Sequence, residues 1–282
     1  MNNANLKSRL AGFTSSKLSL KSLLLIFAVV LLSSFVMKKR EKPTLFLIGD
    51  STVKNGKGKG DGGLWGWGSF LHEYFDTARI SVKNEALGGT STRTFMYRGR
   101  WEAVLPQIKK GDYLMMQFGH NDAGPLDDTA RARGTIQGIS DESKEIYNPI
   151  IKQNEVVHSY GWYLKKFVAD AKAKGATVII CSPIPRNAWK DGKVNRANQD
   201  YGKWAQETAG QCGAFFIDLN TLIADDYDAE GETKVKTDYF NTKDHTHPIE
   251  AGARLNTLKV VEGIKGIKNL SLRKYLTRQA IK

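Results

Sequence analysis

The sequence predicts an α/β fold, a three-layer α/β/α sandwich with a mainly parallel five-stranded sheet. Short apolar runs without polar alternation recur along the chain, and such runs are typical of strands that are buried on both faces of a parallel sheet. Stretches with helical spacing of apolar residues separate these runs. Strands that alternate with helices indicate right-handed βαβ units, with helices covering both faces of the sheet.

The first strand is expected at residues 44–48, which lead directly into Gly49-Asp50-Ser51. Further strands are expected at 80–84, 113–118, 177–181 and 214–217, and helices at 65–75, 101–108, 155–174, 195–211 and 250–264. Residues 123–153 show little periodicity and are too long for an ordinary connection. We expect them to form an inserted flap or hairpin beside the functional site.

The two ends of the chain carry the net charge of +13. Residues 1–40 hold seven Lys or Arg residues and no acid, whereas residues 259–282 hold seven Lys or Arg residues and one Glu. Residues 41–258 are therefore neutral overall. A nucleic-acid-binding protein needs a basic face on the fold itself, so we expect no nucleic-acid partner. The basic segment 265–282 is expected to be a solvated C-terminal tail.

Residues 1–40 have the character of a targeting segment. Basic residues up to Lys21 precede an apolar run at 22–37, and no Ala-x-Ala cleavage signal follows it. The run is long for a signal-peptide core and short for a transmembrane helix. We expect a signal peptide or membrane anchor on an exported protein, with a buried N-terminal helix as the alternative, and residues 41–282 as a single, monomeric domain.

Polar residues follow two of the expected strands at the point where each strand ends. Ser51 follows the first strand, and the block from Gly119 to Asp122 follows the third. Ligands of open α/β sheets bind beyond the carboxyl ends of the strands, so Ser51 is a candidate nucleophile. Gly, Asp and Ser also form ordinary turns, and this alternative stays open for Gly49-Asp50-Ser51 taken alone.

Acyl transfer requires a nucleophile, a base, a group that orients the base and donors for the oxyanion. Asp244 and His247 are three positions apart, which in a helix-like turn brings the carboxylate toward the imidazole. Asp244 can then orient His247 as the base for Ser51. The backbone N–H groups of Ser51 and Gly89, together with the side-chain amide of Asn121, can converge on the carbonyl oxygen of an ester.

Four blocks in this order resemble the SGNH (GDSL) hydrolases over about residues 44–264. The longer forms of the blocks are similar to the rhamnogalacturonan acetylesterase branch: Gly49-Asp50-Ser51-Thr52, Asn84-x-Ala86-x-x-Gly89-x-Ser91-x-Arg93, Phe118-Gly119-His120-Asn121-Asp122 and Asp244-His245-Thr246-His247-Pro248.

That resemblance implies a flavodoxin-like sandwich and a serine esterase that removes acetyl groups from plant cell-wall polysaccharide. It implies a triad of Ser51, Asp244 and His247, with Ser51, Gly89 and Asn121 around the oxyanion. No cofactor and no metal are expected.

Three residues are candidates for contacts with the substrate. Arg93 lies in a loop that could face the site and would suit a uronate-bearing polymer, although a solvated surface position is the alternative. Trp67 could line a cleft or belong to the core. His120 is expected either to contact substrate or to hydrogen-bond within its loop. The expected partner is an acetylated polysaccharide or oligosaccharide, most simply rhamnogalacturonan, with xylan or another acetylated glycan as the alternative.

Two other classes of function are alternatives to the esterase. A metal-dependent phosphoesterase could use His120, Asp122, His245 and His247, but these residues match no familiar ligand spacing. A non-catalytic carbohydrate-binding protein would have no need of the complete set of Ser51, Asp244 and His247. Separately, the sequence leaves the pairing of Cys181 with Cys212 open, because it does not show that their Cα atoms lie within disulfide distance.

Overall fold

The computed structural model describes residues 42–281. The segment 1–40, expected to be a signal peptide or anchor, lies outside the described residues. In the part of the chain that the structure describes, none of the helices has the length and apolar character needed to cross a bilayer.

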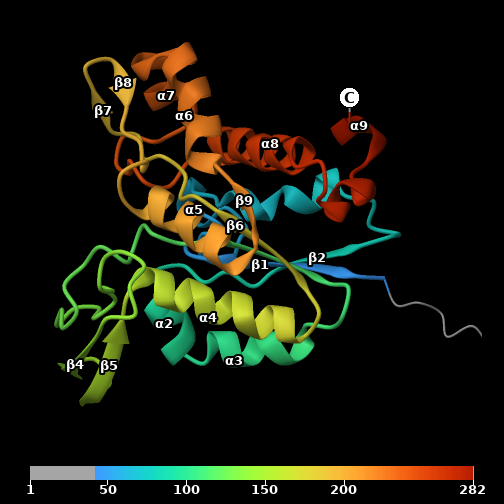
Figure 1. The fold of residues 1–282 in the computed structure, drawn as a ribbon. Helices are drawn as coiled ribbons and strands as arrows, with labels where there is room; N and C mark the ends of the chain where they lie inside the picture. The colour runs from blue at the N-terminus through green and yellow to red at the C-terminus, as the bar shows by residue number, and fades with distance from the viewer. Residues whose placement is uncertain (1–41, 282) are drawn as a thin grey trace, which may run out of the picture. The chain divides into compact units, whose positions relative to one another are not determined.

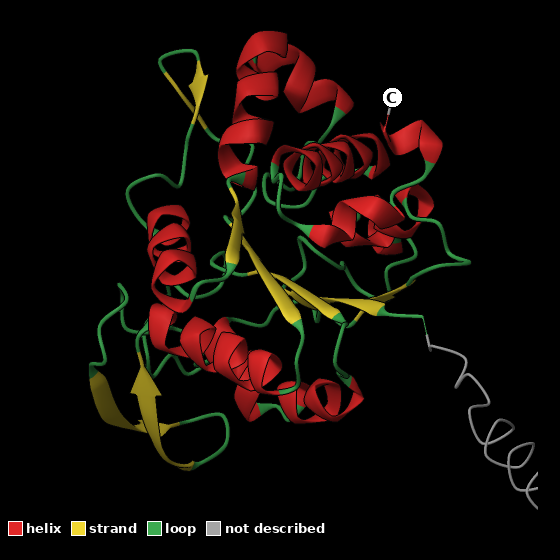
Figure 2. Cartoon of the chain, turned by 45° about the vertical axis from the view of Figure 1, so that its right-hand side comes forward, coloured by secondary structure: helices red, strands yellow, loops and turns green. Residues whose placement is uncertain are grey.

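A five-stranded parallel sheet forms the centre of the domain, as predicted (Figure 2). Its strands are β1 (Thr44–Gly49), β2 (Ser81–Asn84), β3 (Tyr113–Gln117), β6 (Thr177–Cys181) and β9 (Phe215–Ile217), in the order β2-β1-β3-β6-β9. Every neighbouring pair runs parallel. The sheet is therefore doubly wound, since the chain builds outward first on one side of β1 and then on the other.

The strand order places the functional segments together. β1 pairs with both β2 and β3, and Gly49 at the end of β1 is in register with Gln117 at the end of β3. The direction of winding reverses at this point, and such a switch point opens a crevice beyond the carboxyl ends of the strands. The turn at Ser51 and the loop at Asn121 both begin here.

Helices cover both faces of the sheet (Figure 1). The first layer comprises α2 (Thr92–Tyr97), α3 (Arg100–Val104), α4 (Tyr160–Ala173) and α5 (Tyr201–Cys212), and the second contains α6 (Leu219–Glu230) and α8 (Glu250–Gly266), with α7 (Glu232–Asp238) after α6 and α9 (Arg278–Ile281) at the C-terminus. Short 3₁₀ turns lie at Asp61–Gly63, Trp67–Ser69, Leu71–Tyr74, Leu105–Gln107 and Ser271–Tyr275.

Successive residues of a strand point to opposite layers. On β1, Phe46 and Ile48 join the core under α4, whereas Leu45 and Leu47 join the core under α8. All four side chains are at most 1% exposed. Because both faces are buried, the strand has no polar alternation, which is the feature that made the sheet predictable from the sequence.

Two antiparallel hairpins project from the domain: β4 (Ser143–Asn148) with β5 (Gln153–His158), and β7 (Trp189–Lys190) with β8 (Lys193–Val194). The first hairpin uses residues that the sequence assigned to a helix from 155. The helix α4 begins only at Tyr160, because residues 153–158 pair with β4 and the Ser159 hydroxyl caps the helix by accepting from the backbone N–H of Trp162.

Other expected boundaries also move. The helix expected at 195–211 begins at Tyr201, and the residues before it form a loop, while the helix expected at 65–75 is two 3₁₀ turns. The sequence did not predict α6 and α7. Cys181 and Cys212 are both free thiols, and burial raises the pKa of Cys181.

The expectation of a solvated tail at 265–282 is wrong for much of that segment. Leu270, Leu272 and Leu276 are buried in the same core as β1 and α8. The hydroxyls of Ser271 and Tyr113 are also hydrogen-bonded, at 2.7 Å. The leucines hold this segment against the domain, while the side chains of Lys268, Arg273 and Lys274 are exposed.

Candidate active site

Ser51, His247 and Asp244 form a continuous hydrogen-bonded chain. The Oγ atom of Ser51 lies 2.7 Å from Nε2 of His247, and Nδ1 of His247 lies 2.7 Å from Oδ2 of Asp244. The serine follows β1, while the other two residues belong to the loop before α8. With the Nδ1 proton donated to the carboxylate, the Nε2 lone pair is directed at the serine hydroxyl, which is the arrangement that activates a serine.

The loop that carries the imidazole is held by Asp244 itself. Its Oδ1 atom accepts hydrogen bonds from the backbone N–H groups of Thr246, at 2.7 Å, and His247, at 2.9 Å. This is an Asx-type turn rather than the helix-like turn expected from the spacing. Burial acts to raise the pKa of Asp244, but the hydrogen bonds from His247 and Thr246 outweigh it and hold the pKa below its ordinary value. The carboxylate form is therefore favoured.

A tight turn presents Ser51 beyond the end of β1. The Oδ1 atom of Asp50 accepts from the backbone N–H of Thr52 at 2.8 Å and from its hydroxyl at 2.7 Å. A Cβ atom on Gly49 would lie 2.4 Å from the backbone oxygen of Gln117, so only glycine fits between β1 and β3 at this position. The turn is thus fixed by local hydrogen bonds and by close strand packing.

A buried relay supports this turn from below. The side-chain amide of Gln117 donates to the hydroxyl of Thr52 at 2.6 Å, and its oxygen accepts from the indole N–H of Trp67 at 2.9 Å. Trp67 is fully buried. The substrate contact expected for Trp67 is therefore not available, and its ring instead orients Gln117 under the nucleophile turn.

The loop at Gly89 borders the serine. A Cβ atom on Gly88 would lie 3.6 Å from the Cβ of Ser51, and Gly89 has a φ of +76° with open space where a side chain would project. The positive φ favours glycine. The side-chain amide of Asn121 donates to the backbone oxygen of Thr90 at 2.9 Å. This hydrogen bond uses one of the two N–H groups of the amide. The structure thus brings Asn121 to the loop that follows Gly89.

Asp122 anchors the Asn121 loop to the start of α2. Its Oδ1 atom accepts from the backbone N–H of Thr92 at 3.0 Å and from the Thr92 hydroxyl at 2.6 Å. The side chain is fully buried, and this burial raises its pKa to about 7 against the opposing effect of the Thr92 hydrogen bonds. Asp122 therefore has a structural position behind the site.

His120 lies between the nucleophile turn and the segment after β6. Its Nε2 atom lies 3.0 Å from the backbone oxygen of Ile184, and its Nδ1 atom lies 3.4 Å from Oδ2 of Asp50. The second separation is an ion-pair contact that is long for a hydrogen bond. Burial acts to raise the pKa of Asp50, but the charge of His120 and the hydrogen bonds that Asp50 accepts lower it overall. The side chain of His120 is 5% exposed, so its polar atoms face protein groups.

Arg93 is buried rather than exposed to a substrate. Its guanidinium group forms a two-point ion pair with Glu155, at 2.8 and 2.5 Å, and donates to the backbone oxygens of Leu126 and Gly134. The whole residue is 1% exposed. The expected uronate contact of Arg93 is therefore not available, because its donors tie α2 to the excursion and hairpin at 123–158.

Arg186 connects the two halves of the site, whereas the sequence suggested only that it lies in a loop that could face a uronate-bearing substrate. Its guanidinium donates to the hydroxyl of Thr246, in the imidazole loop, and to the backbone oxygen of His120, next to Asn121, at 3.1 Å. Burial lowers the pKa of Arg186, while the carboxylates of Asp50 and Asp244 act in the opposite direction. The position of Arg186 just beyond a strand expected at 177–181 was the sequence feature that could have indicated a place at the site.

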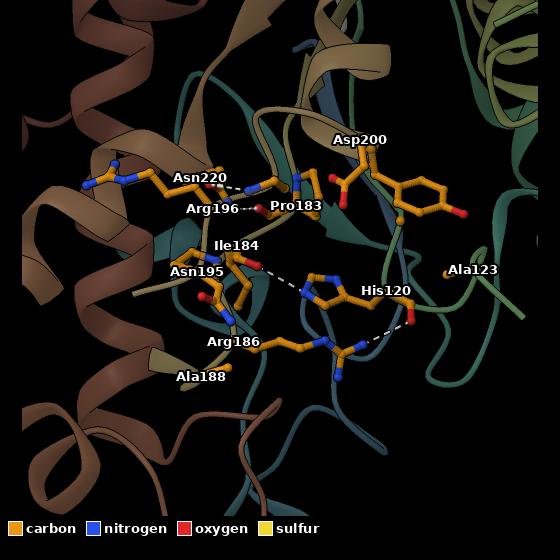
Figure 3. Close-up of a pocket in the computed structure, with 14 residues that line it drawn as sticks. His120, Ala123, Pro183, Ile184, Arg186, Ala188, Asn195, Arg196, Asp200 and Asn220 are labelled. Atoms are coloured by element: carbon orange, nitrogen blue, oxygen red, sulfur yellow. Dashed lines mark hydrogen bonds between the residues drawn. The ribbon is translucent and has the colours of Figure 1, made fainter. Parts of the chain in front are cut away.

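A pocket of about 250 Å³ opens beside this site (Figure 3). His120 and Arg186 form the side nearest the triad, and the segment 183–201 supplies most of the remaining wall. Across residues 42–281, no group of three or more His, Cys, Asp or Glu side chains is arranged to hold a metal ion.

Comparison with known proteins identifies the family to which the chain belongs. Residues 47–255 match the model of the GDSL-like lipase/acylhydrolase family. The chain is 29% identical over 227 residues to the rhamnogalacturonan acetylesterase of Emericella nidulans, covering 80% of this chain and 86% of that protein. It is 33% identical over 226 residues to the probable rhamnogalacturonan acetylesterase YesY of Bacillus subtilis, covering 78% and 92%.

Solved structures agree in fold. The structure of YxiM from Bacillus subtilis matches with a TM-score of 0.62 and 27% identity over 79% of this chain, and the chain spans 56% of that protein's length. The acetylxylan esterase Axe2 from Geobacillus stearothermophilus matches with a TM-score of 0.52 and 19% identity, covering 80% and 95%, and shares the fold. The chain belongs to the GDSL-like lipase/acylhydrolase family and is a carboxylic ester hydrolase.

Proposed function

We propose that this protein is a serine esterase that removes acetyl groups from plant cell-wall polysaccharide, rhamnogalacturonan foremost. The observation that carries the proposal is the pair of 2.7 Å contacts joining Ser51 to His247 and His247 to Asp244. Rhamnogalacturonan is preferred to xylan because the two relatives cited at 29% and 33% identity are named for it. The acetylxylan esterase at 19% identity informs on fold alone.

The proposed reaction has two stages. His247 Nε2 takes the proton from the Ser51 hydroxyl as the oxygen attacks the carbonyl carbon of the acetyl group. The backbone N–H groups of Ser51 and Gly89 and the amide of Asn121 stabilise the oxyanion that forms. Collapse breaks the bond to the sugar oxygen, which leaves with the proton from His247. Water, activated by the same imidazole, then hydrolyses the acetyl-enzyme and releases acetate.

Arg186 and Asp122 act in this scheme as positioning residues. Arg186 links the loop that carries His247 to the loop that carries His120 and Asn121. Asp122 links this second loop to α2. A displacement of about 1 Å can lower a rate by about 10²-fold. These contacts therefore matter because they hold the nucleophile, the base and the oxyanion donors at fixed positions relative to one another.

Acetate release from acetylated rhamnogalacturonan, acetylated xylan and an aryl acetate tests the proposal. We expect the wild type to act on all three with preference for the first, and Ser51→Ala to lose activity on each while remaining folded by circular dichroism. Activity is expected to survive EDTA, whereas a metal-dependent phosphoesterase would lose activity with the chelator. Retention of full activity in Ser51→Ala would overturn the serine mechanism, and binding of glycan without acetate release would favour the carbohydrate-binding alternative.

We also propose that the protein is exported, since an enzyme acting on a polymer must meet it outside the cell and residues 1–40 carry basic residues before an apolar run. Cell fractionation with an antibody to the C-terminal half tests this. Recovery of the protein solely in the cytoplasm would contradict it.

A further inference from the structure

The pocket beside the triad has one wall made largely of apolar residues. Pro183, Ile184, Pro185 and Ala188 line it from the segment between β6 and α5, where the first three are buried and Ala188 is half-buried. Its volume of about 250 Å³ is below the range of about 300–1,000 Å³ found for drug-sized ligands. The space therefore suits one monosaccharide unit better than a longer segment of polymer.

The pocket borders the proposed catalytic centre without containing the triad. Arg186 reaches from its wall to Thr246, which is adjacent in sequence to His247, and His120 in its wall is adjacent to Asn121. Ser51 is not among the lining residues. A glycan whose acetylated unit sits at Ser51 would place a neighbouring unit, rather than the acetylated one, in this pocket.

Most polar side chains of the lining already have hydrogen-bond or ion-pair partners within the protein. Arg196 is paired with Asp228 at 2.7 Å and with Asp225 at 2.9 Å, and its side chain extends away from the pocket in Figure 3. Asn220 is buried, donates to the backbone oxygen of Pro183 at 2.7 Å and accepts from a backbone N–H. These residues shape the wall and have little left to offer a ligand.

Three polar side chains of the lining lack a hydrogen-bond partner within the described chain, and one of them, the hydroxyl of Tyr201, is buried. Asn195 and Asp200 are both exposed, line the pocket and have no side-chain hydrogen-bond partner among residues 42–281. Asp200 precedes α5 without capping it. A carboxylate that accepts and an amide that both donates and accepts are complementary to the hydroxyl groups of a sugar.

The charges around the pocket disfavour an acidic ring. Arg196 faces two carboxylates, the charge of Arg186 is opposed by Asp50 and Asp244, and Asp200 has no cation paired with it in the described chain. A uronate in the pocket would meet the free carboxylate of Asp200, and like charges placed together at an interface are costly. A neutral sugar would meet an acceptor for its hydroxyls.

We propose that this pocket is a subsite for a neutral pyranosyl unit next to the acetylated one, selected by Asn195 and Asp200 against a uronate. The inference rests on the proposed esterase function and adds to it which neighbour the enzyme accepts. Specificity then comes chiefly from the loop between β6 and α5.

Acetyl oligosaccharides of two kinds test the subsite: rhamnogalacturonan fragments, whose acetylated units have neutral neighbours, and oligogalacturonides, whose neighbours are uronates. We expect the wild type to have a KM about tenfold lower for the first kind, and Asp200→Asn to reduce this preference about tenfold. Asn195→Ala should raise the KM for the neutral series. The matched control is Asp191→Asn, which removes a carboxylate from the exposed hairpin of the same segment outside the pocket and should keep the preference.

Binding to the Ser51→Ala protein provides a second measurement that needs no turnover. Titration with deacetylated rhamnogalacturonan oligosaccharide should give a Kd about tenfold higher when Asp200→Asn is added, and an unchanged Kd with Asp191→Asn. Equal KM values for the two series, or equal effects of Asp200→Asn and Asp191→Asn, would overturn the subsite. If no glycan releases acetate, the esterase proposal fails, while the titration still decides whether the pocket holds a neutral sugar.

Discussion

Oδ2 of Asp244 accepts a hydrogen bond from Nδ1 of His247 at 2.7 Å, while Oδ1 of the same carboxylate accepts the backbone N–H groups of residues 246 and 247. One carboxylate thus orients both the imidazole ring and the loop that carries it. Its depressed pKa, maintained by these hydrogen bonds against burial, means that the carboxylate persists under acidic conditions in which an ordinary aspartate begins to take up a proton.

Asp244→Asn is expected to lower kcat on an aryl acetate by about 10³- to 10⁴-fold. With the amide oxygen kept on the backbone N–H groups, an NH₂ group would face Nδ1 and favour the tautomer that carries the proton on Nε2, which cannot accept from Ser51. Steady-state kinetics with a circular dichroism spectrum would check this. A kcat within tenfold of wild type, in a folded variant, would remove Asp244 from the orienting role.

The sheet and the order of the site residues could be predicted from the sequence for one physical reason. Strands buried on both faces become continuous apolar runs, and parallel strands bring their carboxyl ends to one edge. Ser51 and Asn121 each follow such a run, so their meeting at the crevice between β1 and β3 follows from the strand order.

The features that the sequence did not predict depend on contacts between residues that are not neighbours in the chain. Residues 155–158 continue the helical spacing of α4, yet they pair with β4 because two antiparallel strands satisfy each other's backbone groups. Trp67 was expected near substrate because it lies at the end of a loop, and Arg93 because its expected loop could face the site. Their burial depends on Gln117 and Glu155, which are 50 and 62 positions away and carry no local signal of the pairing.

Thr246 offers a test of the contact made by Arg186. Thr246→Val keeps the shape of the side chain but removes the hydroxyl that accepts from the guanidinium group, so the imidazole loop loses its tie to the His120 loop. We expect kcat on an aryl acetate to fall on the order of tenfold, with a smaller change in KM. Thr246→Ser retains the hydroxyl and should restore most of the rate. Equal rates for the valine and serine variants would show that the contact does not position the base.

Arg93→Met is expected to destabilise the fold by about 3–5 kcal/mol, because Glu155 would be left largely buried without its cation. Urea denaturation monitored by fluorescence would measure the change in the free energy of unfolding. Arg98→Met is the matched control, since Arg98 is exposed and its loss should stay within about 0.5 kcal/mol. A raised KM for glycan with unchanged stability would instead return Arg93 to substrate binding.

Asp122 should make stability fall as the pH rises from acid to neutral. Burial raises its pKa to about 7 in the folded protein, whereas an unfolded chain has the ordinary value of about 3.9. Between these values the folded state holds a proton that the unfolded state has lost. The stabilisation is therefore complete below about pH 4 and is lost through about pH 7, at up to about 1.4 kcal/mol per pH unit.

Asp122→Asn removes this titration while its oxygen can still accept from Thr92. We expect the variant to gain stability relative to wild type between pH 5 and pH 8, as measured by urea denaturation at each pH. Asp127→Asn, at an exposed position of the same excursion, should follow the wild-type pH dependence. If Asp122→Asn instead keeps the pH dependence of the wild type, Asp122 is not the group that titrates. The carboxyl group would then already be ionised in the folded protein at pH 5, stabilised by its hydrogen bonds from Thr92.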